Sequence, residues 1–231
     1  MKNLQESLEG LHEHYLELLK NVNRVLDVNV EMLKNQKLDF GLYGECVVVE
    51  DVINALEVRI KDDAIISIAR FQPAAVNLRL LIMMINSARL LERMGDLLKA
   101  NFSIIKDIER NSPHIAKYLQ SMLYPMVLKI KNIFEMYVKA VIDNDEKALY
   151  LLLTRDEDID EISHQNMNSL TELMKASPDN VQGGTDLVLL NKNYERFSDH
   201  VMHLVVDLVY ILKGENLRKI ELLEEKKLSK K

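Results

Sequence analysis

A short acidic segment occurs twice in this chain, and this repeat constrains the fold more than any other feature of the sequence. Residues 91–96 read LERMGD and residues 194–199 read YERFSD, 103 positions further on. A proline precedes each copy by fewer than twenty residues, and an acidic stretch precedes each proline, at residues 50–54 and 156–160. Landmarks that recur in the same order at nearly constant spacing predict a duplicated unit of about one hundred residues.

The composition favours helices throughout. With 48% hydrophobic residues among 231, the chain can bury a large core. Seven glycines and four prolines are too few for the many turns of an all-β protein. Leu, Ile, Met, Lys and Glu dominate instead, and these residues favour α-helix. We therefore predict an all-α fold.

Charge and cysteine content limit the partners and the compartment. A net charge of −6 disfavours sequence-independent binding of nucleic acid, which needs a basic face. The single cysteine, Cys46, excludes an intramolecular disulfide and suits a reducing compartment. No signal-peptide pattern opens the chain, and the most apolar windows, residues 78–85 and 204–212, are shorter than the ~20 residues of a spanning helix. We expect a cytoplasmic protein that can still work beside a membrane.

Apolar residues three or four positions apart predict six long helices. They are expected over residues 3–34, 39–69, 73–109, 112–142, 146–175 and 177–213. Asp39, Ser112 and Ser177 are the expected N-terminal caps, the two serines each followed by a proline. The last helix carries an apolar seven-residue repeat formed by Leu190, Tyr194, Phe197, Val201, Leu204, Leu208 and Ile211.

Six helices in two similar sets predict two tandem three-helix bundles, because short connections make consecutive helices antiparallel neighbours. The first bundle is expected over residues 1–110 and the second over residues 111–214, joined side by side or end to end. A highly charged tail follows at residues 215–231.

Acidic residues four positions apart are the candidate metal ligands, because such residues lie above one another on a helix. Carboxylates combined with imidazole suit Fe, Mn or Zn, with Mg as a further candidate. The second half of the chain is the better candidate, since only its two columns include histidine. The four columns are Glu50 with Asn54, Glu92 with Asp96, Asp156 with Asp160 and His164, and Glu195 with Asp199 and His203.

Two other interpretations of these columns stay open. If Tyr194, Phe197 and Val201 face the core, the column on the same helix lies on a more exposed side and is a solvated helix face. Alternatively, the columns form the site of a di-metal carboxylate enzyme, an oxidase or hydrolase. Glu161 and His164 match the Glu-x-x-His element of di-iron bundles, but the element occurs once. No phosphate-binding loop or nucleophile-base set is present, so we expect no enzymatic activity.

The duplicated motifs resemble those of the PhoU family of bacterial and archaeal phosphate-uptake regulators, over nearly the whole chain. In the first half, residues 69–80 (ARFQPAAVNLRL) look like the family's R-Q-P-x-A-x-D-L-R segment, and LERMGD looks like L-E-R-I-G-D. In the second half, YERFSDH at 194–200 looks like E-R-I-G-D-H, and VYILKG at 209–214 looks like the closing helix and glycine. The chain departs from the pattern at Asn54, Asn77 and Ser198, where the family usually has Asp, Asp and Gly.

This resemblance implies a fold, a function and a set of site residues. The fold would be two three-helix bundles with acidic, metal-binding motifs on the second and third helices of each. The function would be to link a phosphate ABC transporter to a sensor histidine kinase, restraining uptake and the starvation response when phosphate is plentiful. The partners would be the transporter ATPase and the kinase, with peripheral association with membrane complexes, and the chain would form a homodimer. Carried over by position, the motifs fall on Glu50, Asn54, Glu92, Asp96, Asp156, Asp160, Glu195 and Asp199.

Overall fold

The structure is a computed structural model that describes residues 3–153 and 156–213. Within these ranges, the side chains of residues 146, 156, 157, 212 and 213 are not described. The regular elements of the described chain are all helical, which confirms the all-α prediction. The charged tail expected at 215–231 lies outside the described residues. The helices are α1 (Leu4–Asn35), α2 (Phe40–Phe71), α3 (Ala75–Asn111), α4 (Tyr124–Asp143), α5 (Glu146–Leu153), α6 (Asp156–Ala176) and α7 (Val181–Lys213).

Two of the predicted caps are confirmed. Asp39 accepts hydrogen bonds from the backbone N–H groups of Gly41 and Leu42, at 2.8 and 3.0 Å, and α2 begins at the next residue. The Ser177 hydroxyl accepts from the N–H of Asp179 at 3.3 Å and opens a short 3₁₀ turn that leads into α7. Each cap satisfies N–H groups that have no partner inside the helix.

The start expected for the fourth helix is wrong. Ser112 makes no side-chain cap and precedes only a 3₁₀ turn, and a π-helical turn at Leu119–Leu123 comes before α4. Pro125 explains the difference. A proline inside an α-helix lacks a donor and clashes with the carbonyl four residues earlier. The wider π turn takes up this conflict, so that Pro125 falls in the first turn of α4, where it is tolerated.

The predicted fifth helix corresponds to two helices, α5 and α6. Residues 154 and 155, between them, lie outside the described residues. Leu149 and Leu152 of α5 are fully buried, and α5 packs on α4 and α7. α5 therefore belongs to the second bundle together with α6.

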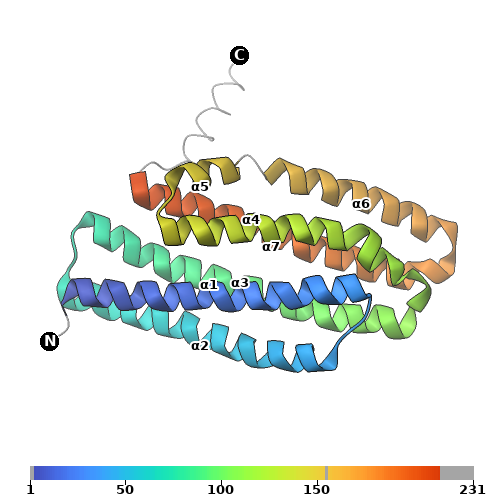
Figure 1. Cartoon of the computed structure of the whole chain (residues 1–231), viewed down its shortest axis with the longest axis horizontal. Coiled ribbons are helices and arrows are strands. Elements are labelled where there is room, and N and C mark those ends of the chain that lie inside the picture. The colour runs from blue at the N-terminus through green and yellow to red at the C-terminus, as the bar shows by residue number, and fades with distance from the viewer. Residues whose placement is uncertain (1–2, 154–155, 214–231) are drawn as a thin grey trace, which may run out of the picture.

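The two bundles lie side by side (Figure 1). α1, α2 and α3 pack together, and α4, α6 and α7 form the second set with α5. α3 packs against α7 and α1 packs against α4 along the seam between the sets. The exact boundary at residues 110 and 111 stays a prediction.

The core follows the helical periodicity. Leu190, Tyr194, Phe197, Val201 and Leu204 of the predicted α7 repeat are buried, while Leu208 and Ile211 are partly buried and packed against the core. This seam is therefore confirmed, and α7 buries one face against the elements of both bundles.

A buried polar network joins the two bundles. The Tyr194 hydroxyl donates to Asn29 Oδ1 at 2.9 Å, which ties α7 to α1. Asn29 Nδ2 donates to the carbonyl of Leu98 on α3 at 3.2 Å. Asn193 Nδ2 donates to Asn101 Oδ1 at 2.8 Å, across the α3–α7 seam. Because buried polar groups without partners are costly, this network fixes the register of the two bundles.

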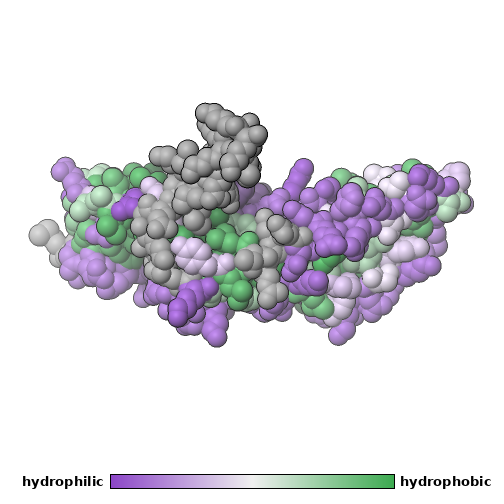
Figure 2. Space-filling view, turned by 90° about the horizontal axis from the view of Figure 1, so that it is seen from above, coloured by the Kyte–Doolittle hydropathy of each residue, from purple (hydrophilic) through white to green (hydrophobic). Residues whose placement is uncertain are grey.

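The surface carries both hydrophilic and hydrophobic residues. Figure 2 shows the face that carries α5 and α6, with hydrophobic residues gathered toward the end where α3 begins. Val76 and Ile82, in the first two turns of α3, are among the exposed hydrophobic residues. Within the described ranges, no helix combines the length and the apolar character needed to cross a membrane.

Candidate functional site

The acidic residues of the first half come together on α2 and α3. Glu50 is buried, with only 6% of its surface exposed, and Asn54 Nδ2 donates to its Oε1 at 2.9 Å. The ammonium of Lys99, on α3, lies 2.5 Å from Glu50 Oε2. Glu92 is half-buried and Asp96 is exposed on the same helix as Lys99. The four predicted ligands are thus adjacent, but a lysine of the chain already neutralises the most buried carboxylate.

The pKa values of this group reflect that arrangement. Burial opposes ionisation of Glu50, but hydrogen bonds from Lys99 and Asn54 outweigh it and lower the pKa of the carboxyl. Burial raises the pKa of Asp96, and the nearby negative charge of Glu50 raises it further. Burial and the charge of Asp96 likewise raise the pKa of Glu92. The site is electrostatically satisfied at Glu50 and less so at the other two carboxyls.

The second-half residues lie on α6 and α7. The Asp156 side chain is outside the described part, although its backbone begins α6. Glu195 accepts a short hydrogen bond from the Ser163 hydroxyl, and the ammonium of Lys192 lies 2.7 Å from its Oε2. Here too a lysine and a neutral donor engage one of the predicted carboxylates.

Around the Asp199 carboxyl, negative charge is not fully neutralised. Burial raises the pKa of its carboxyl, and the charges of Asp160 and Glu195 raise it further, while His203 has a lowering effect. Asp160, His164 and His203 are exposed. Carboxylates of α6 and α7 are therefore close enough to repel one another, as the predicted columns require.

The fit to a metal ion differs between the halves. Among the side chains that the structure describes, no group of three or more His, Cys, Asp or Glu is placed to hold a metal. In the first half Lys99 already pairs with Glu50, while the charge of Glu50 raises the pKa of Asp96. In the second half the mutual repulsion at Asp199 is the kind that a cation relieves. The ligand role of these residues stays a prediction.

Sequence reasoning missed three residues that complete these groups: Lys99, Ser163 and Lys192. Lys192 and Glu195 are three apart on one helix, a spacing at which side chains meet, so this pair could have been found. Lys99 and Glu50 are 49 residues apart. Their pairing depends on how α2 packs on α3, which no local spacing reveals.

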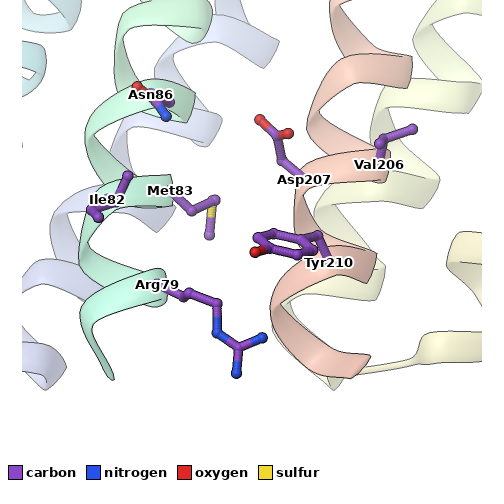
Figure 3. Close-up of a pocket in the computed structure, with 7 residues that line it drawn as sticks. All are labelled: Arg79, Ile82, Met83, Asn86, Val206, Asp207 and Tyr210. Carbon is purple, nitrogen blue, oxygen red and sulfur yellow. The ribbon is translucent and has the colours of Figure 1, made fainter. Parts of the chain in front are cut away.

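A separate pocket of about 320 Å³ lies between α3 and α7, lined by residues 79–86 and 206–210. Figure 3 shows Tyr210 between Arg79 and Asp207. The Arg79 guanidinium carbon is 5.8 Å from the centre of the Tyr210 ring, within the range of a cation–π contact. No predicted ligand lines this pocket.

Comparison with known proteins gives the family. The family model described as PhoU domain matches residues 15–105 and again residues 123–207, one match in each bundle. The chain belongs to the PhoU family. The duplication that residues 91–96 and 194–199 indicate is thus a duplication of the PhoU domain.

Curated PhoU relatives match over almost their full length. A protein of Deinococcus radiodurans named phosphate-specific transport system accessory protein PhoU homolog is 25% identical, covering 91% of this chain and 97% of the relative. A Rhizobium meliloti protein of the same name is 27% identical, covering 93% of this chain and 89% of the relative.

Solved PhoU structures share the fold. The crystal structure of PhoU from Pseudomonas aeruginosa superposes with a TM-score of 0.84 at 22% identity, covering 92% of this chain and all of that one. The phosphate transport system regulatory protein PhoU from Streptococcus pneumoniae gives a TM-score of 0.81 at 21% identity, covering 92% and 98%. The pair of three-helix bundles is therefore the PhoU architecture.

Proposed function

We propose that this chain is a cytoplasmic accessory protein of a phosphate-specific transport system, restraining phosphate uptake and the starvation response when phosphate is plentiful. One observation carries the proposal: a PhoU domain matches in each half, and relatives that match over nine tenths of the chain are named as accessory proteins of such a system. The action is binding rather than catalysis, on the transporter ATPase and on a sensor histidine kinase. We also propose that the chain forms a homodimer.

The outer face of α2 supports a role in protein contacts. Val48, Val58 and Ile66 are 64%, 51% and 57% exposed, and Val52 and Ile65 are exposed beside them. Isolated exposed apolar residues are ordinary, but a row of them on one helix is typical of a surface that contacts a partner. We therefore propose this face of α2 as a partner-binding surface and test it first on the transporter ATPase.

Metal binding, within this proposal, is confined to the second bundle. Asp160, Glu195, Asp199 and the histidines of the same columns are not grouped closely enough to hold an ion in this arrangement, so they would have to draw together around an Fe, Mn or Zn ion, which would neutralise the repulsion at Asp199. In the first bundle the Lys99 ammonium already neutralises the Glu50 carboxylate. No observation favours the alternative of a di-metal oxidase or hydrolase.

A binding assay with the full chain tests the proposal. The chain is immobilised and offered the transporter ATPase and the cytoplasmic part of the kinase. We expect the wild type to retain both, and Val58→Asp/Ile66→Asp to lose the ATPase. Val181→Asp/Leu189→Asp, which changes two equally exposed residues of α7, is the matched control. Retention of neither protein by the wild type would contradict the proposal.

A further inference from the structure

A second opening in the α3–α7 seam contains the arginines of both repeated motifs. This groove, of about 530 Å³, is lined by residues 93–100 of α3 and 193–200 of α7. Arg93 and Arg196 occupy the same place in LERMGD and YERFSD, 103 residues apart. Because α3 and α7 run antiparallel where they pack, the duplication brings the two arginines to the same groove.

Both guanidinium groups are available to a ligand. Arg93 and Arg196 are exposed, and within the described ranges neither forms a hydrogen bond or ion pair with another residue. Each guanidinium presents a planar set of donors that matches the oxygens of a phosphate or carboxylate. Two such groups facing one groove provide a site for an oxyanion.

His200 adds a polar atom in need of a partner. Its Nδ1 is buried and has no hydrogen-bond partner among the described residues. Burial lowers the pKa of the imidazole, and the neighbouring charges of His203, Arg93 and Arg196 lower it further. His200 itself lines the groove beside the two arginines.

Asp96 determines which oxyanion fits. Asp96 lines the same groove while its carboxyl also neighbours Glu50, and its negative charge repels an anion that carries only acceptors. Phosphate at neutral pH keeps at least one P–OH group, which can donate a hydrogen bond to that carboxylate, whereas sulfate has no such proton. The set of two arginine donors and one carboxylate acceptor thus matches a protonated phosphate group.

We infer that this groove binds hydrogen phosphate, held by Arg93 and Arg196 and selected by Asp96. The groove is larger than the ion, so a phosphomonoester also fits, but with a second pKa of about 6 most of it has lost the P–OH group at neutral pH. The inference rests on the proposed function only in the choice of free phosphate over the ester. It would make the seam between the two bundles the place where the protein senses phosphate.

Calorimetric titration of the full chain tests the inference. Inorganic phosphate, sulfate and glycerol phosphate are titrated at neutral pH and matched ionic strength. We expect saturable binding of one phosphate per chain and much weaker binding of sulfate. Charge-assisted contacts of this kind predict that Arg93→Gln or Arg196→Gln weakens phosphate binding about tenfold or more. Arg59→Gln/Arg110→Gln, which removes two exposed charges outside the groove, is expected to bind as the wild type does.

The remaining outcomes each decide the question. Asp96→Asn is expected to bind sulfate nearly as well as phosphate, since the repelling carboxylate is gone. Glycerol phosphate binding more tightly than inorganic phosphate would overturn the choice of free phosphate. An absence of saturable phosphate binding, or equal binding by Arg93→Gln/Arg196→Gln and the wild type, would overturn the site itself. Because the titration contains no partner protein, its failure is separate from failure of the partner-binding assay.

Discussion

At the scale of single residues, Lys99 is the side chain on which the first acidic group depends. Lys99→Met leaves the buried Glu50 carboxylate without its ammonium, so we expect the free energy of unfolding to fall by about 1–3 kcal/mol at pH 7. The loss is no larger because the lysine is itself partly exposed to solvent, which weakens the ion pair. The pKa of Glu50 is lowered in the fold. The contribution is therefore present above the ordinary carboxyl value of 4.5 and is lost as the pH falls through the folded value.

Urea denaturation at pH 7 and at acid pH measures this loss. Glu50→Gln/Lys99→Met is the control, since it removes the charge as well as its partner and should recover most of the stability. Equal stability of Lys99→Met and the wild type at pH 7 would show that the pair contributes nothing.

For Asp199 the predicted dependence of stability on pH has the opposite sign to that for Glu50. Its pKa is raised by burial and by Asp160 and Glu195, so the native state favours the protonated form. Stability then falls as the pH rises from the ordinary value of 3.8 through the raised value. Asp199→Asn should therefore be more stable than the wild type at pH 7, by a few tenths to about 1 kcal/mol, and should lose this gain below pH 3.8.

Thermal unfolding of Asp199→Asn and the wild type at pH 7 and below pH 3.8 measures this difference in stability. Repeating the measurement with and without chelator also tests the metal proposal. Added Mn²⁺ should stabilise the wild type but not Asp160→Asn/Asp199→Asn, and elemental analysis should find metal only in the wild type. The exposed Asp62→Asn is the matched control. If Mn²⁺ stabilises neither protein, the second-bundle carboxylates are a solvated face.

At the scale of elements, the start of α7 packs closely enough to require glycine. A Cβ at Gly183 would lie 2.2 Å from Cδ1 of Ile115, so Gly183→Ala should destabilise the protein by about 1–3 kcal/mol through overpacking. Gly44→Ala, in α2, meets no atom within 4 Å and should stabilise by about 0.5–1 kcal/mol, because alanine favours helix over glycine. Urea denaturation midpoints of Gly183→Ala and Gly44→Ala, each compared with the wild type, test both expectations. Similar midpoints for the two variants would contradict the close packing at Gly183.

The helices also show what sequence reasoning can reach. The Asp39 cap, the α7 repeat and the order of the six expected helices depend on local spacing, and local spacing is visible in the sequence. The π turn before Pro125 was missed because Ser112 and Pro113 offered a nearer cap and first turn, although Pro125 sets where α4 can begin. The lysine beside Glu50 and the meeting of Arg93 with Arg196 were missed because both depend on which helices pack together.

At the scale of the whole molecule, the two bundles are coupled through buried hydrogen bonds. The hydroxyls of Tyr15, on α1, and Tyr137, on α4, are 2.8 Å apart and both rings are buried. Tyr15→Phe leaves the Tyr137 hydroxyl without this partner and should cost about 1–3 kcal/mol. Tyr15→Phe/Tyr137→Phe should cost less than the sum of the single variants. A double-mutant cycle in urea gives the coupling, and strictly additive losses would contradict it.

The regulatory role is tested most directly by phosphate uptake in the organism that carries this chain. Cells lacking the gene are grown with plentiful phosphate, and their uptake rate and a reporter of the starvation response are compared with those of the parent strain. We expect both to rise in the deletion strain and to return to the parental level when the full chain is expressed again. Unchanged uptake and an unchanged reporter in the deletion strain would contradict the proposed function.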